Sequence, residues 1–270
     1  NKLISEAEGW KYSFTNLNKY KDGKEIKYTI DEENISGYEK TIDGYNLINT
    51  HKIKPTVDFS LRKFITDVNE VKVEPSRAPQ VDITPLVNGT STTATYIHPK
   101  NAIFVNTGDV VTYTLRVYNE GEIRGYASLI KDDIPDGLEF IPNNNTNKEY
   151  LWEMLDANGN KVTDVSKAKY VVSNYLSKEV SEANLIKAFD KNTSKELDYK
   201  EVKVSFKVIS TDTTGKELIN YAQISKETDS EGNDVKDRDS TPDKWIEGED
   251  DQDIEKVKLT YLDLSLRKFI

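Results

Sequence analysis

Alternation of apolar and polar residues dominates this chain and predicts a protein built from short antiparallel strands. The clearest run is 110–119, where Val111, Tyr113, Leu115 and Val117 occupy every second position. Side chains alternate between the two faces of a strand, so this period places the four residues on one buried face. Further runs predict strands at 9–14, 25–30, 45–50, 126–134, 151–155, 169–172, 202–208 and 217–224.

Turn residues separate these runs, for example Asp43-Gly44 and Pro135-Asp136-Gly137. One segment differs, because the apolar residues of 179–190 suit a short amphipathic helix. Many short alternating strands divided by turns are typical of antiparallel β-sandwiches. We therefore expect an all-β fold of Ig-like sandwich domains in tandem, with one short helix in the larger domain.

An internal repeat sets the expected domain organisation. The phrase Asp-Phe-Ser-Leu-Arg-Lys-Phe-Ile at 58–65 returns at 263–270 with seven of eight positions identical. A repeat at domain-sized spacing predicts a tandem array from which this chain is a piece. The expected parts are 1–52 as the end of one domain, 53–245 as a second domain with its core at 57–225 and an acidic linker from about 227, and 257–270 as the first strand of the next repeat.

Composition narrows the classes of partner and site. Asp and Glu number 47 against 37 Lys and Arg, and the resulting formal net charge of −10 argues against nucleic acids and anionic membranes as partners. No apolar stretch is long enough for a transmembrane span. The absence of cysteine fits a cytosolic protein or an exported bacterial protein without disulfides, and cannot choose between them. Two histidines make a His-based site improbable, and the acidic run 229–234 lacks EF-hand spacing, so we predict no cofactor and no metal.

A lysine interrupts one apolar strand face. Phe59, Leu61, Lys63 and Ile65 share a face of the repeated strand, so burial of that face would bury the lysine too. An isolated buried ammonium is very costly and must be paired, neutral or chemically altered. The alternative is a lysine at a sheet edge whose head group reaches water. Periodicity alone favours this alternative.

Two further polar residues occupy apolar faces. Asp132 shares its face with the apolar residues of 126–134, whereas Asp133 is expected to point outward; Asn220 shares its face with the apolar residues of 217–224. One interpretation is a buried hydrogen-bonded network. The other is an amide bond between side chains: a neutral lysine amine attacks the carboxamide carbon, protonated Asp132 polarises the carboxamide oxygen and moves protons, and ammonia leaves.

Three motifs in order carry a family resemblance. Gly-Asp-Val-Val-Thr-Tyr-Thr at 108–114, Asp-Asp-Ile-Pro-Asp-Gly-Leu at 132–138 and Leu-Ile-Asn-Tyr-Ala at 218–222 resemble the isopeptide-forming D2-type domain of Gram-positive fimbrial proteins. The resemblance covers roughly 57–224. It implies that Lys63 and Asn220 form an isopeptide bond with help from Asp132.

The first fifty residues carry a second resemblance. Gly-Trp-Lys-Tyr-Ser-Phe-Thr-Asn-Leu at 9–17, the run 28–38 and Leu-Ile-Asn-Thr at 47–50 are similar to the second half of a collagen-binding-protein B-type (CnaB) domain. This implies a Lys–Asn isopeptide bond at Asn49, promoted by Glu32, with a lysine that we expect to precede this segment. In the second copy of the repeat, Lys268 is expected to pair with an aspartate and an asparagine further along the array.

These resemblances imply a structural stalk segment of a cell-surface adhesin or pilus-like protein, stabilised by self-cross-linking and not a turnover enzyme. The expected location is extracellular, on a Gram-positive cell wall, anchored through another segment. Expected partners are neighbouring domains of the array, with host extracellular matrix or glycan as candidates. The alternative is a carbohydrate- or protein-binding module of a secreted multidomain protein, which an exposed aromatic platform would favour. An intracellular enzyme has no support, because no phosphate loop or His-based site is present.

Overall fold

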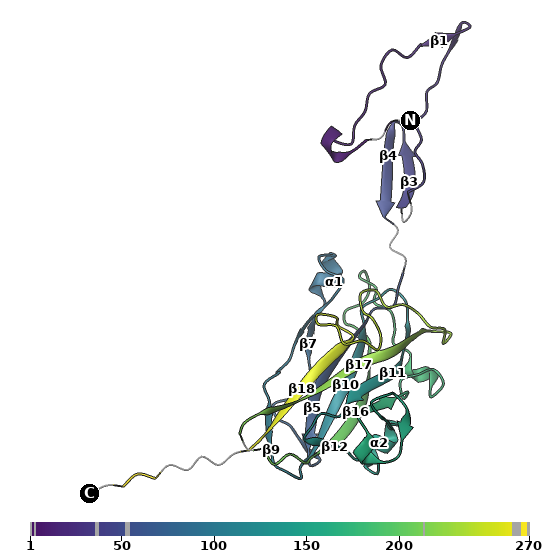
Figure 1. Cartoon of the computed structure of the whole chain (residues 1–270). Helices are drawn as coiled ribbons and strands as arrows, with labels where there is room; N and C mark the ends of the chain where they lie inside the picture. Colours follow the sequence, from purple (N-terminus) through teal and green to yellow (C-terminus); the bar gives the residue numbers. More distant parts are fainter. Residues whose placement is uncertain are drawn as a thin grey trace. The chain divides into compact units, whose positions relative to one another are not determined.

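The computed structural model describes residues 2, 4–35, 38–51, 55–212, 214–260 and 266–268. The chain divides into two compact units, Asn1–Lys54 and Pro55–Ile270, and Figure 1 shows the elements of both. Each unit is described by itself below.

Unit 1 is built around one hairpin. Strands β3 (Tyr38–Asp43) and β4 (Asn46–His51) pair antiparallel, and β4 fulfils the strand predicted at 45–50. The other elements are η1 (Glu6–Glu8), β1 (Tyr20–Lys21) and β2 (Lys24–Glu25). The strands predicted at 9–14 and 25–30 do not form among the described residues, apart from the start of the second in β2. Trp10 and Phe14 are 69% and 62% exposed, so their alternating apolar face remains largely exposed.

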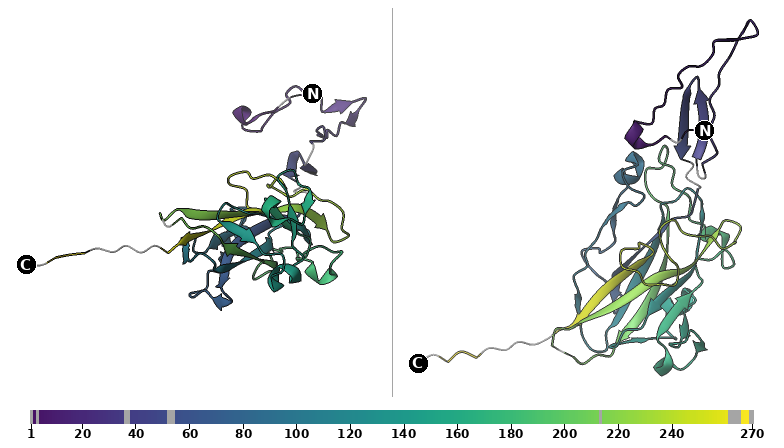
Figure 2. Two further views of the ribbon diagram at one scale, coloured as in Figure 1. Left: turned by 60° about the horizontal axis from the view of Figure 1, so that its bottom comes forward. Right: turned by 45° about the horizontal axis from the view of Figure 1, so that its top comes forward.

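Unit 2 is a β-sandwich, and Figure 2 shows its strands stacked in layers. The five-stranded sheet has the order β12-β16-β10-β5-β6, and the seven-stranded sheet has the order β14-β13-β15-β11-β17-β18-β9. Pairing is antiparallel except between β18 and β9. The first sheet comprises β12 (Leu138–Phe140), β16 (Tyr199–Val208), β10 (Val110–Asn119), β5 (Phe59–Val68) and β6 (Val71–Lys72). The second comprises β14 (Lys161–Val162), β13 (Glu153–Leu155), β15 (Tyr170–Ser173), β11 (Gly125–Asp133), β17 (Glu217–Asp229), β18 (Gln252–Leu259) and β9 (Ile103–Val105).

The alternating residues of the sequence form the core between these sheets. Val111, Tyr113, Leu115 and Val117 on β10 are all fully buried, as their period predicted. They pack with the inward residues of β5, β11, β16 and β17 in one continuous cluster. Burial of apolar surface at about 25 cal/mol per Å² is the main force that holds two such sheets together. The predicted all-β sandwich architecture is therefore confirmed for this unit.

Smaller elements cover the edges of the sandwich. The hairpin β7 (Gln80–Asp82) and β8 (Thr95–Ile97) encloses α1 (Thr84–Asn88). Helix α2 (Asn145–Glu149) lies beside β16, where Asn147 exchanges hydrogen bonds with the backbone of Ser205 (Figure 1). The short 3₁₀ segments are η2 (Val165–Lys167) and η3 (Glu182–Asn184).

Two expectations about this unit differ from the structure. The helix expected at 179–190 is reduced to η3, because Ile186 instead forms a β-bridge to Gly125 of β11. The stretch expected to be an acidic linker from about 227 is folded: β17 continues to Asp229, and β18 adds a further strand beside it. From Ile254 on, residues of β18 alternate between half-buried and buried, but frequent charges hide this period in the sequence. Among the described residues the last strand of the sandwich is therefore β18, and most of the second repeated phrase, 263–265 and 269–270, lies outside the described residues.

Candidate functional site

The lysine that interrupts the apolar face of β5 is fully buried in the sandwich. Lys63 has 0% exposure and lies opposite Leu115 in the register of β5 and β10. Its neighbours Leu61 and Ile65 are at most 1% exposed, so the strand phase predicted for this face is correct. The sheet-edge alternative, in which the head group reaches water, is wrong. Lys63 Nζ also lies 4.9 Å from the centroid of the Tyr113 ring, whose face attracts a cation.

Asp132 bridges the two other groups of the site. One carboxylate oxygen, Oδ2, accepts a hydrogen bond from Lys63 Nζ, and the other, Oδ1, accepts one from Asn220 Nδ2 at 2.6 Å. All three side chains have 0% exposure. They come from β5, β11 and β17, so the site spans both sheets of the sandwich. The structure thus brings together the three residues that the sequence placed on buried faces.

Only the nitrogen of the Asn220 carboxamide is held by hydrogen bonds. Its Nδ2 also donates to the backbone oxygen and to Oδ1 of Asp133, both at 2.8 Å, while its own Oδ1 is buried without a hydrogen-bond partner. Asp133 Oδ1 in addition accepts from the Tyr221 amide. The expected outward orientation of Asp133 therefore missed a contact of the site. Strict alternation ends at this residue, because it is the last of β11 and precedes Ile134-Pro135.

Burial controls the protonation of the bridging acid. Removal from water raises the pKa of Asp132 to about 6, and the nearby Lys63 only partly opposes this shift. Burial likewise raises the pKa of Asp133. A carboxyl group with a pKa near neutrality can both take up and release a proton under physiological conditions. The arrangement therefore offers an amine and a carboxamide that each contact the same proton carrier inside a dry core.

The other predicted site residues are not brought together with partners of this kind. In unit 1, Asn49 on β4 pairs in register with Lys40 of β3. Lys40 Nζ donates to Asp31 Oδ1 and to the backbone oxygen of Glu32, while Glu32 Oε1 is buried without a hydrogen-bond partner. No described contact joins Glu32 to Asn49. In unit 2, Lys268 is exposed in a segment without regular secondary structure.

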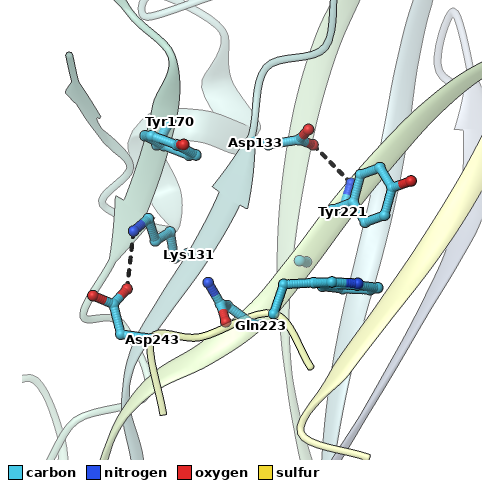
Figure 3. A pocket seen from close by; sticks show the side chains of 8 residues that line it. Lys131, Asp133, Tyr170, Tyr221, Gln223 and Asp243 are labelled. Atoms are coloured by element: carbon cyan, nitrogen blue, oxygen red, sulfur yellow. Dashed lines mark hydrogen bonds and ion pairs between the residues drawn. The ribbon is translucent and has the colours of Figure 1, made fainter. Parts of the chain in front are cut away.

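A surface hollow lies on the outer side of β11 and β17. Its volume is about 320 Å³, and Figure 3 shows Lys131, Tyr170, Tyr221 and Asp243 around it. This is where a glycan-binding module would present an aromatic platform. The rings of Tyr221 and Trp245, however, meet edge to face at 89°. They form no single flat surface for stacking on a sugar.

Comparison with known proteins supports the resemblance of the first fifty residues. The family model of the Cna protein B-type domain matches residues 1–50. Over 170 residues the chain is 24% identical to a collagen adhesin of Staphylococcus aureus, and the matched region covers 60% of this chain and 13% of that protein. The chain therefore spans only a small part of this relative.

Two solved structures illustrate the comparison with known folds. The major pilin subunit BcpA of Bacillus cereus shares 10% identity over 84% of this chain and 52% of that chain, with a TM-score of 0.31. The collagen-binding domain of a Staphylococcus aureus adhesin shares 11% identity over 69% of this chain and 99% of that chain, with a TM-score of 0.25. No described helix is long and apolar enough to cross a membrane. The chain is therefore similar to the Cna protein B-type domain at residues 1–50 and, over 170 residues, to part of a collagen adhesin of Staphylococcus aureus.

Proposed function

We propose that this chain is a stalk segment of an extracellular adhesin or pilus-like protein, in which unit 2 closes an isopeptide bond between Lys63 and Asn220. The observation that supports this most directly is the Asp132 carboxylate, whose two oxygens contact the amine and the carboxamide separately. A counter-charge for a buried ammonium would explain the contact with Lys63 alone, whereas the second contact brings the carboxamide to the same acid. The dry core keeps water away from both of them.

The first step is a proton transfer within the ion pair. Lys63 must lose one proton before its nitrogen can act as a nucleophile, and Asp132 Oδ2 is the acceptor already in contact with it. Burial favours this transfer, because it replaces two buried charges with two neutral groups. The raised pKa of Asp132 acts in the same direction.

The second step forms the new bond. The lysine nitrogen attacks Cγ of Asn220, and a half-turn of the carboxamide lets the neutral acid donate to Oδ1, which otherwise has no partner. The tetrahedral intermediate collapses as the C–Nδ2 bond breaks and the attacking nitrogen loses its second proton. The nitrogen that leaves takes up a proton through Asp132, so lysine amine and carboxamide give one secondary amide and one ammonia. No cofactor takes part.

Such a bond would tie one sheet of the sandwich to the other. It would close a loop of 157 residues (220 − 63) between β5 and β17. By analogy with disulfides, the lost entropy of the unfolded chain corresponds to about 5 kcal/mol of stabilisation. Under tension the covalent link, rather than the hydrogen-bonded strands, would bear the load. This is the property that a stalk between a cell wall and an adhesive tip requires.

The partners and location follow as part of the same proposal. The relative named above is a collagen adhesin, and host extracellular matrix or glycan is therefore a candidate ligand of the complete protein. The neighbouring domains of the array are the immediate partners of this segment. We place it outside the cell, anchored to the Gram-positive wall through a part of the protein other than this segment.

Intact mass under denaturing conditions tests the proposal. We expect the purified chain to be lighter than its sequence by one ammonia and to yield a branched peptide containing Lys63 and Asn220 after digestion. Asn220→Ala should show its full theoretical mass. Lys131→Ala is the matched control, because Lys131 neighbours Asp132 but lies on the outer face, and it should keep the loss. A full theoretical mass for the unmodified chain would refute the cross-link.

A further inference from the structure

A group of carboxylates gathers at the end of the sandwich where the chain enters β5. Asp58 immediately precedes β5, and Asp250 lies just before β18. Asp239 belongs to the long connection between β17 and β18, which Figure 1 shows as the loop between these strands. One oxygen from each of these three residues lies within 4.8 Å of the other two. Segments far apart in the sequence therefore bring three carboxylates together here.

Buried carboxylates without hydrogen-bond partners surround this trio. Glu227 on β17 is 2% exposed and Asp251 is 0% exposed, yet neither oxygen of either side chain has a partner. Asp58 is also 0% exposed, and its Oδ1 is unpartnered as well. Unpaired buried carboxylates are rare in folded proteins, because losing their hydration costs several kcal/mol. Five oxygens of fully or almost fully buried acids therefore lack any donor.

Glu227 faces the other acids of the group. The charges of Asp237, Asp251 and Asp58, together with burial, raise the pKa of Glu227 well above its ordinary value. Burial, together with the charges of Asp237, Asp239 and Asp250, raises the pKa of Asp58 to about 9. These acids therefore lie close enough to influence one another's pKa.

Local cations do not balance this charge. Arg238 NH1 donates to Asp58 Oδ2 at 2.8 Å, but its NH2 is directed to Glu122. Arg62 acts on Asp250, yet its hydrogen bonds go to backbone oxygens. The other acids that act on Asp250 are Glu120 and residues of the group itself. Acidic side chains therefore outnumber the cations that contact them here.

Asp237 shapes the loop that carries these groups. Its Oδ2 accepts from the amide of Phe59, and its Oδ1 accepts from the amides of Asp239 and Ser240. These contacts hold the loop against the first residue of β5. They also fix Asp239 beside Asp58 without help from a cation.

We propose that Asp58, Asp239 and Asp250 hold one calcium ion, with Glu227 and Asp251 directed toward the same site. Carboxylate oxygens with neither His nor Cys select a hard cation over a transition metal. Two oxygens bound to one calcium ion stand at most about 5 Å apart, and the three oxygens, which lie within 4.8 Å of one another, meet this limit without rearrangement. Magnesium is disfavoured, because it demands near-ideal octahedral geometry and keeps most of its water.

The ion would secure a part of the domain that the Lys63–Asn220 link does not enclose. The connection from β17 to β18 follows Asn220 in the chain, so it lies outside the covalent loop. A calcium ion would join this connection to the start of β5 through Asp239 and Asp58. The site stands on its own contacts and does not depend on the cross-link.

Calcium titration of the full chain by isothermal calorimetry, after removal of metal with EDTA, tests this inference. We expect one binding site with a Kd of about 10⁻⁴ to 10⁻³ M, the usual range of extracellular modules. Magnesium should bind at least tenfold more weakly. Bound calcium should also slow proteolysis of the loop at 230–251.

Substitutions locate the site. Asp58→Asn and Asp239→Asn should each weaken calcium binding by at least about tenfold, and Asp239 is exposed, so its variant tests the site without risk to the core. Asp234→Asn is the matched control: it removes one charge from the same loop, where Asp234 is 77% exposed and pairs with Lys226. Binding unchanged in the first two variants, tighter binding of magnesium, or no binding at millimolar calcium would each overturn the proposal.

Discussion

Lys63 and Asp132 lie 69 residues apart in the chain and form an ion pair from which water is completely excluded. The pair joins β5 of one sheet to β11 of the other. A buried ion pair often contributes little net stability, because desolvation offsets the attraction between the charges. Its value here lies in chemistry: a proton can pass from the amine to the acid, and Asn220 is already in contact with that acid.

The ion pair predicts an unequal cost for removing its two members. Lys63→Met should lose the cross-link, which lowers the free energy of unfolding by about 5 kcal/mol, and it leaves no buried cation. Asp132→Asn should lose the same bond and also leave a buried ammonium without a counter-charge, which lowers the free energy of unfolding by about 3–5 kcal/mol more. Free energies of unfolding from urea titration measure both. The double variant should recover to the level of Lys63→Met, and equal stability of the two single variants would contradict this account.

The raised pKa of Asp132 predicts a pH dependence in a chain that cannot cross-link. In Asn220→Ala the acid stays protonated in the folded state up to about pH 6, whereas its unfolded value is 3.8. The folded state therefore binds more protons, so its stability is greatest below about pH 4 and declines as pH rises through 6. The expected loss is on the order of 3 kcal/mol. Subtracting the stability profile of Asn220→Ala/Asp132→Asn from that of Asn220→Ala, both measured against pH, isolates the contribution of Asp132. A difference that does not change with pH would show that Asp132 titrates normally.

Alternation in the sequence predicted the core and the faces of Asp132 and Asn220, because buried strands impose a strict period of two; for Lys63 periodicity alone favoured a sheet edge, and the family resemblance implied the site. Val110–Asn119 forms β10 as expected, and the phases of Lys63, Asp132 and Asn220 place all three inside. The same period did not reveal β18, because charged residues obscure the alternation there. In β18 the buried positions include Glu255, which is paired with Arg77, so an acidic run conceals a core strand.

The alternating pattern could not predict contacts that depend on tertiary structure. Asp133 reaches Asn220 only because β11 ends there, and alternation assigned it to the outer face. The carboxylate group around Asp58 and Glu227 is assembled from strands and a loop far apart in the chain. Spacing along the sequence shows neither. Local periodicity fixes the face of a residue, whereas the partner on that face depends on strand order.

Asp133 is expected to orient the carboxamide without carrying protons. Asp133→Ala removes the Oδ1 contact to Asn220 and a charge that helps to raise the pKa of Asp132. Cross-linking should therefore slow by about tenfold but still reach completion. Mass spectrometry of the chain at intervals after refolding gives the rate. Asp136→Ala, an exposed neighbour in the following turn, should react at the unmodified rate; complete loss of the bond in Asp133→Ala would instead assign Asp133 the chemical role.

Force spectroscopy should separate the part of unit 2 that the link protects from the part that it does not. The chain has no cysteine, so Pro55→Cys and Thr260→Cys provide unique handles. Val257 pairs with Leu218, close to Asn220, and with Ile103 of β9, so tension at residue 260 must detach β18 from both neighbouring strands. Beyond Asn220 only 40 residues (260 − 220) can then extend.

At about 3.4 Å per residue this segment lengthens the chain by roughly 14 nm, against roughly 70 nm for complete unfolding between the handles. We expect the shorter extension for the chain in EDTA, which removes any bound cation, and the longer one for Lys63→Met. A long extension in the unmodified sequence would mean that no covalent link joins β5 to β17.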